Sequence, residues 1–187
     1  MNLAAECIVD CQCQLGEGAL WDGRDNKLWW LDVPMPSRLH CLQLDTSDHA
    51  IWDMPEMITS MAVRENGKGL IAASHHGINF FDPKTGVLES QMVPEPDLPN
   101  NRCNDGAADS RGRFWFGTMQ NNIAADGSPV DITENSGTLY RLDSDLSLHP
   151  QERNIGVSNT VCWSPDRATM YLTDTLTGWI WAYDFEE

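Results

Sequence analysis

One short pattern recurs four times along the chain, and it limits the folds that the chain can adopt. Each copy has a run of β-forming residues, a turn rich in Gly, Asn, Asp or Pro, and a second run of β-formers, as in a β-hairpin. The copies occupy residues 21–32, 63–72, 108–117 and 163–172. They recur about every 40 to 55 residues, which is the spacing typical of the blades of a β-propeller.

Further strand pairs are predicted between these copies. The pairs are 38–44 with 50–54, 78–81 with 87–92, and 138–142 with 147–151. No apolar stripe with a helical period extends over three turns. The sequence therefore predicts an all-β fold, and specifically a β-propeller.

The length of the chain sets the number of blades. At roughly 45 residues per blade, 187 residues supply about four blades. The alternatives are a closed ring of four or a chain that stops early, and an open ring leaves sheet edges unpaired. Residues 180–187 have the composition of a strand that continues. We expect a single propeller domain over residues 1–187, truncated at its C-terminus.

Charge and hydropathy exclude several classes of partner. The chain has 12 basic and 28 acidic residues, a formal net charge of -16, and this excess repels the phosphates of nucleic acids. Its longest apolar runs are only a few residues, far too short to span a membrane. The first residues show no basic region followed by an apolar stretch, so we expect a cytoplasmic protein.

The pattern of cysteines predicts buried or free thiols rather than a metal site. Six are present and none belongs to a CxxC pair, and in the absence of a secretory leader we expect buried or free thiols. Cys11 and Cys13 with a histidine would make a zinc site, but their spacing matches no zinc-binding pattern.

Three segments carry more polar groups than a scaffold requires. Residues 15–21 place Glu17 between two glycines, which indicates a channel-facing carboxylate or an exposed loop glutamate. Residues 100–106 combine amides, a guanidinium and a carboxylate, which indicates a site for polyhydroxylated or carbonyl ligands or an Asn/Asp-Gly turn. Residues 156–161 offer Asn159 as a neutral oxygen ligand, or a capped turn. All three precede the first strand of a repeat, so a propeller brings them to the same end of its channel.

Several of these motifs resemble a known family. The segments are Leu15-Gly16-Glu17-Gly18, Asn101-Arg102-Cys103-Asn104-Asp105-Gly106, Gly112-Arg113-Phe114-Trp115-Phe116-Gly117-Thr118-Met119, Ser158-Asn159 and Tyr171-Leu172-Thr173-Asp174-Thr175. They resemble the SMP-30/gluconolactonase/regucalcin-like (LRE) family in order and spacing. The resemblance implies a six-bladed propeller, of which this chain is the N-terminal two-thirds, with one divalent cation in its channel and hydrolysis of sugar lactones such as gluconolactone.

The resemblance also implies roles for particular residues. Glu17 and Asn159 match two of the family's three protein metal ligands, and their hard oxygen atoms suit Ca²⁺, Mg²⁺ or Mn²⁺, with Zn²⁺ as a further alternative. Arg102 and Asn104 match positions that contact substrate. The family often has an acidic residue soon after its GTM motif, and Asn122 is the candidate for that substrate-binding position here.

The catalytic residue is unknown from the sequence. The third metal ligand of the family, an aspartate that is also its acid/base residue, would lie beyond Glu187. Asp105 and Asp174 are substitutes within the chain, but a turn or a strand end accounts for each of them.

Metal-assisted hydrolysis of a sugar lactone is the function that these features favour. Bound Ca²⁺, Zn²⁺, Mn²⁺ or Mg²⁺ would polarise the ester carbonyl and activate water, and the partner would be a small sugar lactone. The alternatives are a non-catalytic calcium-binding or scaffold propeller and a phosphotriesterase-like hydrolase. The oligomeric state is not indicated by the sequence.

Overall fold

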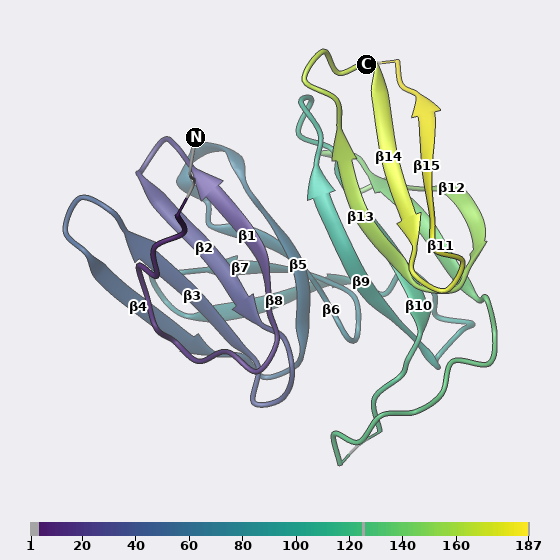
Figure 1. Cartoon of the computed structure of the whole chain (residues 1–187), viewed down its shortest axis with the longest axis horizontal. Helices are drawn as coiled ribbons and strands as arrows, with labels where there is room; N and C mark the ends of the chain where they lie inside the picture. The colour runs from purple at the N-terminus through teal and green to yellow at the C-terminus, as the bar shows by residue number, and fades with distance from the viewer. Residues whose placement is uncertain (1–3, 125, 187) are drawn as a thin grey trace.

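A computed structural model shows four antiparallel sheets arranged as the blades of a propeller (Figure 1). The structure describes residues 4–124 and 126–186. Within these residues the only helical element is the short 3₁₀ turn Glu65–Gly67. The predicted all-β propeller is therefore confirmed.

The first two blades have four strands each, paired in chain order. Blade 1 consists of β1 (Gly16–Asp22), β2 (Lys27–Asp32), β3 (Arg38–Gln43) and β4 (Asp48–Asp53). Blade 2 consists of β5 (Ile58–Val63), β6 (Leu70–Ser74), β7 (Ile78–Asp82) and β8 (Val87–Met92). The predicted hairpins 21–32 and 63–72 are the turns between the first and second strands of these blades.

The third and fourth blades continue the same plan. Blade 3 consists of β9 (Asn101–Ala108), β10 (Phe114–Gln120), β11 (Gly137–Leu142) and β12 (Leu148–Ile155). Blade 4 consists of β13 (Ser158–Trp163), β14 (Thr169–Asp174) and β15 (Trp179–Asp184). The hairpin predicted at 108–117 joins β9 to β10, and the one at 163–172 joins β13 to β14.

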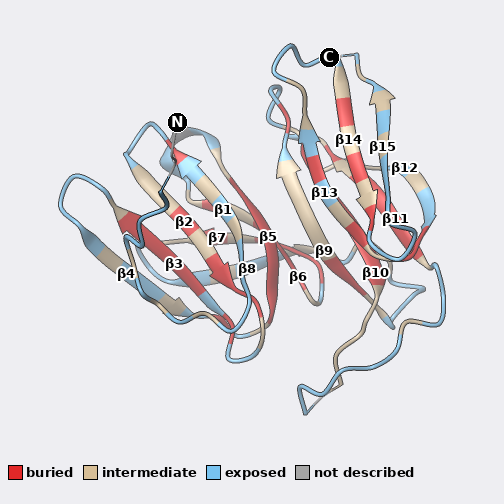
Figure 2. Ribbon diagram, viewed as in Figure 1, coloured by how far each residue is buried: buried red, intermediate tan, exposed pale blue. Residues whose placement is uncertain are grey.

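Apolar side chains hold the blades together in pairs. Figure 2 shows the buried residues following the strands of each blade, and three clusters fill the contacts of blade 1 with 2, 2 with 3, and 3 with 4. Tryptophans contribute to the first and third clusters: Trp29 stacks on Trp52, and Trp115 meets Trp163 edge to face. Because each blade buries apolar side chains against a neighbouring blade, it is stabilised by that neighbour rather than alone.

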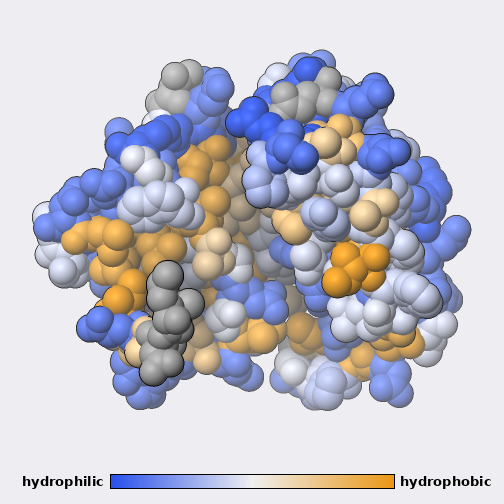
Figure 3. All heavy atoms as spheres, turned by 45° about the horizontal axis from the view of Figure 1, so that its top comes forward, coloured by the Kyte–Doolittle hydropathy of each residue, from blue (hydrophilic) through white to orange (hydrophobic). Residues whose placement is uncertain are grey.

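The surface is mainly hydrophilic on the face seen in Figure 3, with smaller hydrophobic groups between the hydrophilic side chains. No helix in the described ranges, 4–124 and 126–186, is long and apolar enough to cross a membrane.

The first strand of each blade, β1, β5, β9 or β13, is its inner strand. Aspartates at the ends of two inner strands accept hydrogen bonds within the hairpin turns that follow. Asp22, at the end of β1, accepts hydrogen bonds from Arg24 Nε at 2.9 Å and Nη2 at 3.0 Å. Asp109, directly after β9, accepts hydrogen bonds from the backbone and Nε of Arg113 and from Trp115 Nε1. Both carboxylates are buried, so each turn has a fixed side chain at its centre.

The Asp22 pair makes the stability of blade 1 dependent on pH. The hydrogen bonds from Arg24 lower the pKa of Asp22 in the folded chain, so its contribution is present above the unfolded pKa of about 3.9 and is lost as the pH falls through the lower folded pKa. We expect Asp22→Asn to reduce the free energy of unfolding by about 1 kcal/mol at neutral pH, because Arg24 is half-exposed and its attraction is screened.

Urea unfolding across an acid pH series tests this expectation. The difference between wild type and Asp22→Asn should shrink to nothing in strong acid. Asp25→Asn is the matched control, since Asp25 pairs with Lys27 at 3.2 Å while mostly exposed, and its effect at neutral pH should be smaller. If the difference in free energy of unfolding between wild type and Asp22→Asn is the same at every pH, the charge of Asp22 is not its cause.

Candidate functional site

The polar segments lie within the innermost strands of three blades, not in loops that precede them as the sequence suggested. Glu17 is in β1, Arg102 and Asn104 are in β9, and Asn159 is in β13. Each lies near the beginning of its strand. Since the inner strands run in the same sense, these residues share one end of the blades, the lower end in Figure 1.

The pairing of each of these strands shifts register beside the polar residues. The shifts lie between Glu17 and Leu20, at β9 opposite Phe116 and Thr118, and between Asn159 and Cys162. Such a bulge breaks the strict alternation of side chains and turns a residue away from its expected direction. In β9 the irregular stretch between Cys103 and Gly106 contains Asn104 and Asp105, so the regular alternation of side chains is interrupted there.

Backbone strain marks the bulge in β13. Thr160 has a φ of 53°, which is unusual for a β-branched residue. Its amide donates a hydrogen bond to Asp105 Oδ2 at 2.7 Å. The strained conformation thus links blade 4 to blade 3 beside Asn159, and such strain is concentrated at functional sites.

Arg102 brings together the three residues predicted to bind substrate. Its Nη1 donates to Asn104 Oδ1 at 2.8 Å and to the Cys103 carbonyl at 2.8 Å, and its Nη2 donates to Asn122 Oδ1 at 2.9 Å. Asn104 Nδ2 in turn donates to the Ser158 carbonyl at 2.7 Å. Arg102 is only 7% exposed, and burial lowers its pKa to about 10.

One donor of this guanidinium is unused. Arg102 Nε is buried and donates to no acceptor among the described residues. A buried donor without a partner is costly, and it calls for an acceptor such as a water or ligand oxygen. The cluster of Arg102, Asn104 and Asn122 has the chemistry of a site for hydroxyl or carbonyl groups.

Asp105 belongs to this site as well. It lies within β9 rather than in a turn, and its two oxygens accept hydrogen bonds from the amides of Gly106 at 2.8 Å and Thr160 at 2.7 Å. Burial raises its pKa. Asp174, in contrast, is explained by the end of β14, where it accepts hydrogen bonds from the amides of Gly156 and Val157.

The two predicted metal ligands offer free oxygen atoms. Glu17 is exposed, and its carboxylate accepts no hydrogen bond from the described residues. Partial burial and the negative charge of Asp105 raise its pKa, and Arg102 opposes this rise. Asn159 Nδ2 donates to Thr175 Oγ1 at 3.0 Å, and no described residue donates to Asn159 Oδ1.

This donor set fits a hard divalent cation. None of residues 4–124 and 126–186 donates a hydrogen bond to the carboxylate of Glu17, and Asn159 retains a neutral oxygen. Oxygen atoms of both kinds are ligands that Ca²⁺, Mg²⁺ and Mn²⁺ prefer. No group of three or more His, Cys, Asp or Glu side chains gathers as a metal site in the described part of the chain. The side chains of Glu17 and Asn159 therefore have the oxygen chemistry of ligands for a hard divalent cation.

His75 lies in the same electrostatic environment, and the sequence did not indicate it for this site. It directly follows β6, at the same end of the blades as the candidate site. Burial and the positive charges of His76 and Arg102 lower the pKa of His75. The rings of His75 and His76 are 4.7 Å apart. His76 Nδ1 lies 2.9 Å from a carboxylate oxygen of Glu56. The only signal for His75 in the sequence is the His75-His76 pair directly after the second predicted strand of a blade.

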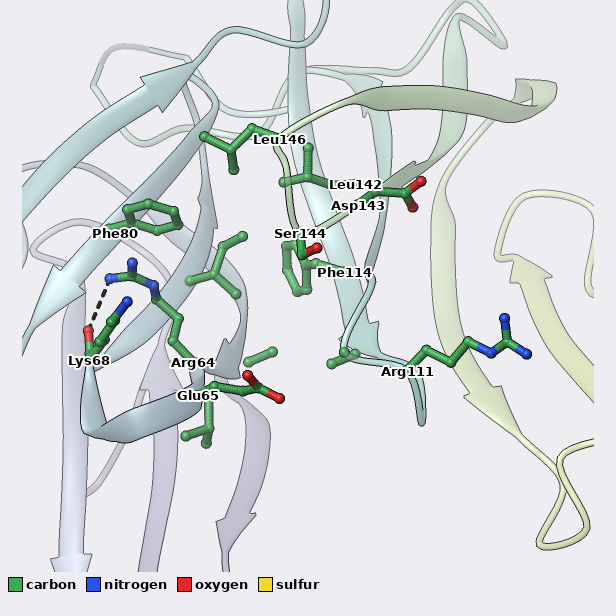
Figure 4. A pocket seen from close by; sticks show the side chains of 15 residues that line it. Arg64, Glu65, Lys68, Phe80, Arg111, Phe114, Leu142, Asp143, Ser144 and Leu146 are labelled. Carbon is green, nitrogen blue, oxygen red and sulfur yellow. Dashed lines mark hydrogen bonds between the residues drawn. The ribbon is translucent and has the colours of Figure 1, made fainter. Parts of the chain in front are cut away.

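A separate hollow lies between blades 2 and 3, at the opposite end of the strands. It has a volume of about 360 Å³ and is lined by Phe80, Phe114 and Leu146 among others. Figure 4 shows Arg64 lying against Phe80, with its guanidinium carbon 3.5 Å from the ring centre and Nη1 donating to the Lys68 carbonyl. Arg64 is therefore already engaged by the Lys68 carbonyl and by the Phe80 ring, and none of the residues predicted to bind substrate or metal lines this hollow.

Comparisons with known proteins place this arrangement in a family. Residues 15–187 match the family model described as the SMP-30/Gluconolactonase/LRE-like region. L-arabinolactonase of Azospirillum brasilense is 32% identical over 97% of this chain and 58% of its own length. 6-Deoxy-6-sulfogluconolactonase of Pseudomonas putida is 32% identical over 100% of this chain and 60% of its own length.

A solved structure agrees with these sequence matches. The calcium-binding protein regucalcin from Agrobacterium tumefaciens str. C58 superposes with a TM-score of 0.79 at 28% identity, covering 92% of this chain and 54% of that one. The chain spans about three fifths of the length of the curated relatives it matches, 58% and 60%. The match over 15–187 and the shared propeller fold show that the chain belongs to the SMP-30/Gluconolactonase/LRE-like family.

Proposed function

We propose that the protein hydrolyses sugar lactones at the end of its inner strands where Glu17, Arg102 and Asn159 lie, with the help of a divalent cation. The observation that carries this proposal is the Arg102 cluster, in which a buried guanidinium holds Asn104 and Asn122 at 2.8 and 2.9 Å. The names of two relatives that are 32% identical, an L-arabinolactonase and a 6-deoxy-6-sulfogluconolactonase, support the reaction class.

Arg102 and the two asparagines would bind and orient the sugar. The fixed guanidinium keeps an unused Nε donor, and the asparagine amides add donors and acceptors that suit ring hydroxyls. Because Asn104 is tied to the Ser158 carbonyl and Arg102 to the Cys103 carbonyl, these groups are positioned before the ligand arrives. Such positioning lowers the entropic cost of reaching the reactive geometry.

Glu17 and Asn159 would hold the cation. A divalent ion bound there would polarise the lactone carbonyl and lower the pKa of water. Asp105 would add negative charge near Glu17 without moving, since backbone amides hold both of its oxygens. The proposed ion is Ca²⁺, Zn²⁺, Mn²⁺ or Mg²⁺, and the calcium-binding regucalcin structure supports a divalent cation in this family.

Proton release from D-glucono-1,5-lactone tests the proposal. The chain is stripped of metal and resupplied with each of the four ions, and spontaneous hydrolysis is measured without protein. We expect one or more ions to raise the rate above the spontaneous rate and to raise the Tm, because an ion that binds only the folded state stabilises it. L-Arabino-1,4-lactone is assayed in parallel.

Glu17→Gln separates the metal site from the rest of the site. The neutral amide keeps the shape of the side chain but removes the charge that attracts the ion, so both the ion-dependent rate and the ion-dependent rise in Tm should disappear. If the ion-dependent rate and rise in Tm are unchanged in Glu17→Gln, Glu17 is not a ligand of the ion. A rise in Tm without turnover would favour a calcium-binding protein without catalysis, and no response to any ion would contradict the metal-dependent proposal.

A further inference from the structure

Two of the six free cysteines lie in direct contact. Cys11 Sγ and Cys13 Sγ are 3.2 Å apart, and both residues are half-buried. The remaining four have no such neighbour: Cys7 and Cys162 are exposed, and Cys41 and Cys103 are buried. This pair lies in the segment before β1, outside the candidate site.

The conformation of Gln12 brings the two sulfurs together. In an extended segment, alternate residues are separated by about 6.6 Å along the chain. Gln12 instead has a φ of 50°, in the left-handed region that a residue with a side chain seldom adopts. The reversed backbone at Gln12 folds the Cys-Gln-Cys unit so that both thiols point to one place.

Contacts with blade 1 fix the position of the pair. The amide of Leu15 donates to Asp32 Oδ1 at 3.0 Å, and the amide of Val33 donates to the Leu15 carbonyl at 3.1 Å. A Cβ atom added to Gly16 would lie 3.4 Å from Cys13 Cβ. The pair therefore lies directly before the inner strand β1, and Glu17 follows Cys13 by four residues.

We propose that Cys11 and Cys13 are a modification site that forms a reversible internal disulfide by exchange with a small-molecule disulfide such as oxidised glutathione. The thiolate of Cys11 attacks one sulfur of glutathione disulfide, forming a mixed disulfide and releasing one glutathione. The thiolate of Cys13 then attacks the Cys11 sulfur and releases the second glutathione. Two protein thiols are oxidised, and one glutathione disulfide is reduced to two thiols.

The surroundings of the thiols select this pair and set the order of attack. Burial and the neighbouring Cys11 raise the pKa of Cys13 to about 11, which keeps Cys13 protonated at first and leaves the initial attack to Cys11. Burial raises the pKa of Cys41 to about 11 and that of Cys103 to about 12. Those two thiols are shielded and should not exchange in the folded chain.

Mass spectrometry of the full chain in glutathione buffers tests the proposal. The protein is equilibrated at a series of oxidised-to-reduced ratios, quenched with acid and alkylated. Cleavage before Asp10 and Asp22 releases the peptide 10–21, which contains Cys11 and Cys13 but not Cys7. We expect this peptide to lose two hydrogen atoms and both alkylation sites as the ratio rises, and to recover them on reduction.

Variants of the middle residue test the backbone geometry. Gln12→Pro fixes φ near −65° and should lower the equilibrium constant for the disulfide about tenfold. Gln12→Gly permits the positive φ and should stay within about threefold of wild type. Cys7→Ser should leave the reaction unchanged, and Cys13→Ser should stop it at a glutathione adduct on Cys11.

Three results would overturn the proposal. The first is a peptide 10–21 that keeps two free thiols at every ratio. The second is equal oxidation of wild type and Gln12→Pro, which would show that the folded geometry has no role. The third is a lasting glutathione adduct on Cys11 in the wild type, which would show that Cys13 does not complete the exchange.

Discussion

Arg102→Met is expected to weaken the binding of D-gluconate, the product of glucono-1,5-lactone opening, about 100-fold. The substitution removes every donor of the guanidinium, including those that hold Asn104 Oδ1 and Asn122 Oδ1. A ligand then loses its charged hydrogen-bond partner and meets an Asn122 side chain without its donor, while Asn104 keeps its hydrogen bond to the Ser158 carbonyl. Isothermal titration calorimetry with the metal-loaded chain measures this loss.

The stability of the fold should respond much less than the affinity. Burial lowers the pKa of Arg102 to about 10, so keeping it charged inside the site costs the fold about 3 kcal/mol. Methionine removes this cost, while the lost hydrogen bonds to Asn104 and Asn122 act in the opposite direction. We expect the free energy of unfolding to remain within about 1 kcal/mol of wild type.

Two further variants make this prediction specific. Arg102→Lys keeps the charge but not the planar fork, and it should bind D-gluconate with intermediate affinity. Arg38→Met is the matched control, because Arg38 pairs with Asp53 at 3.3 Å while both are exposed. If Arg102→Met binds D-gluconate with wild-type affinity, Arg102 does not contribute to the binding site, whatever the result with Arg38→Met.

Gly117→Ala should destabilise the junction of blades 3 and 4 by about 3 kcal/mol. Gly117 lies in β10, and a Cβ atom added there would overlap both Oγ and Cβ of Ser158, the first residue of β13. Ser158 is fully buried, so it has no space into which it can move. Blade 4 would have to shift away from blade 3, and with it Asn159.

A double-mutant cycle tests the contact directly. Ser158→Gly removes the atoms that the new methyl group would overlap, so Gly117→Ala combined with Ser158→Gly should recover most of the stability lost in Gly117→Ala. Gly16→Ala is the control, since an added Cβ there meets only ordinary contacts with Cys13. Urea unfolding measures the four proteins of the cycle and the Gly16→Ala control, and additive effects of Gly117→Ala and Ser158→Gly would contradict the overlap.

The blades themselves could be predicted from the sequence because their signals are local. A hairpin needs a turn between two runs of β-formers, and both lie within about a dozen consecutive residues. The turns at 21–32, 63–72, 108–117 and 163–172 accordingly join the first two strands of every blade. Small differences in strand ends, such as β12 continuing to Ile155, follow pairing with a neighbouring strand rather than turn residues.

The site could be predicted only in part. The motifs led to Glu17, Arg102, Asn104, Asn122 and Asn159, and the structure brings the Arg102 cluster together. The prediction that a turn accounts for Asp105 was wrong, although an Asn-Asp-Gly run is typical of a turn. In the structure this residue instead lies within β9 and accepts a hydrogen bond from Thr160, 55 positions later in the chain.

The sequence by itself determined the all-β architecture, the blade repeat and the residue types available at the candidate site. Only the tertiary structure decided which of those residues meet. Arg102 reaches Asn122 across 20 positions, and Asn104 reaches the Ser158 carbonyl across 54. These contacts depend on the packing of whole blades and on bulges that turn side chains out of their regular alternation. Neither leaves a periodic pattern in the sequence, because each depends on a neighbour distant in the chain.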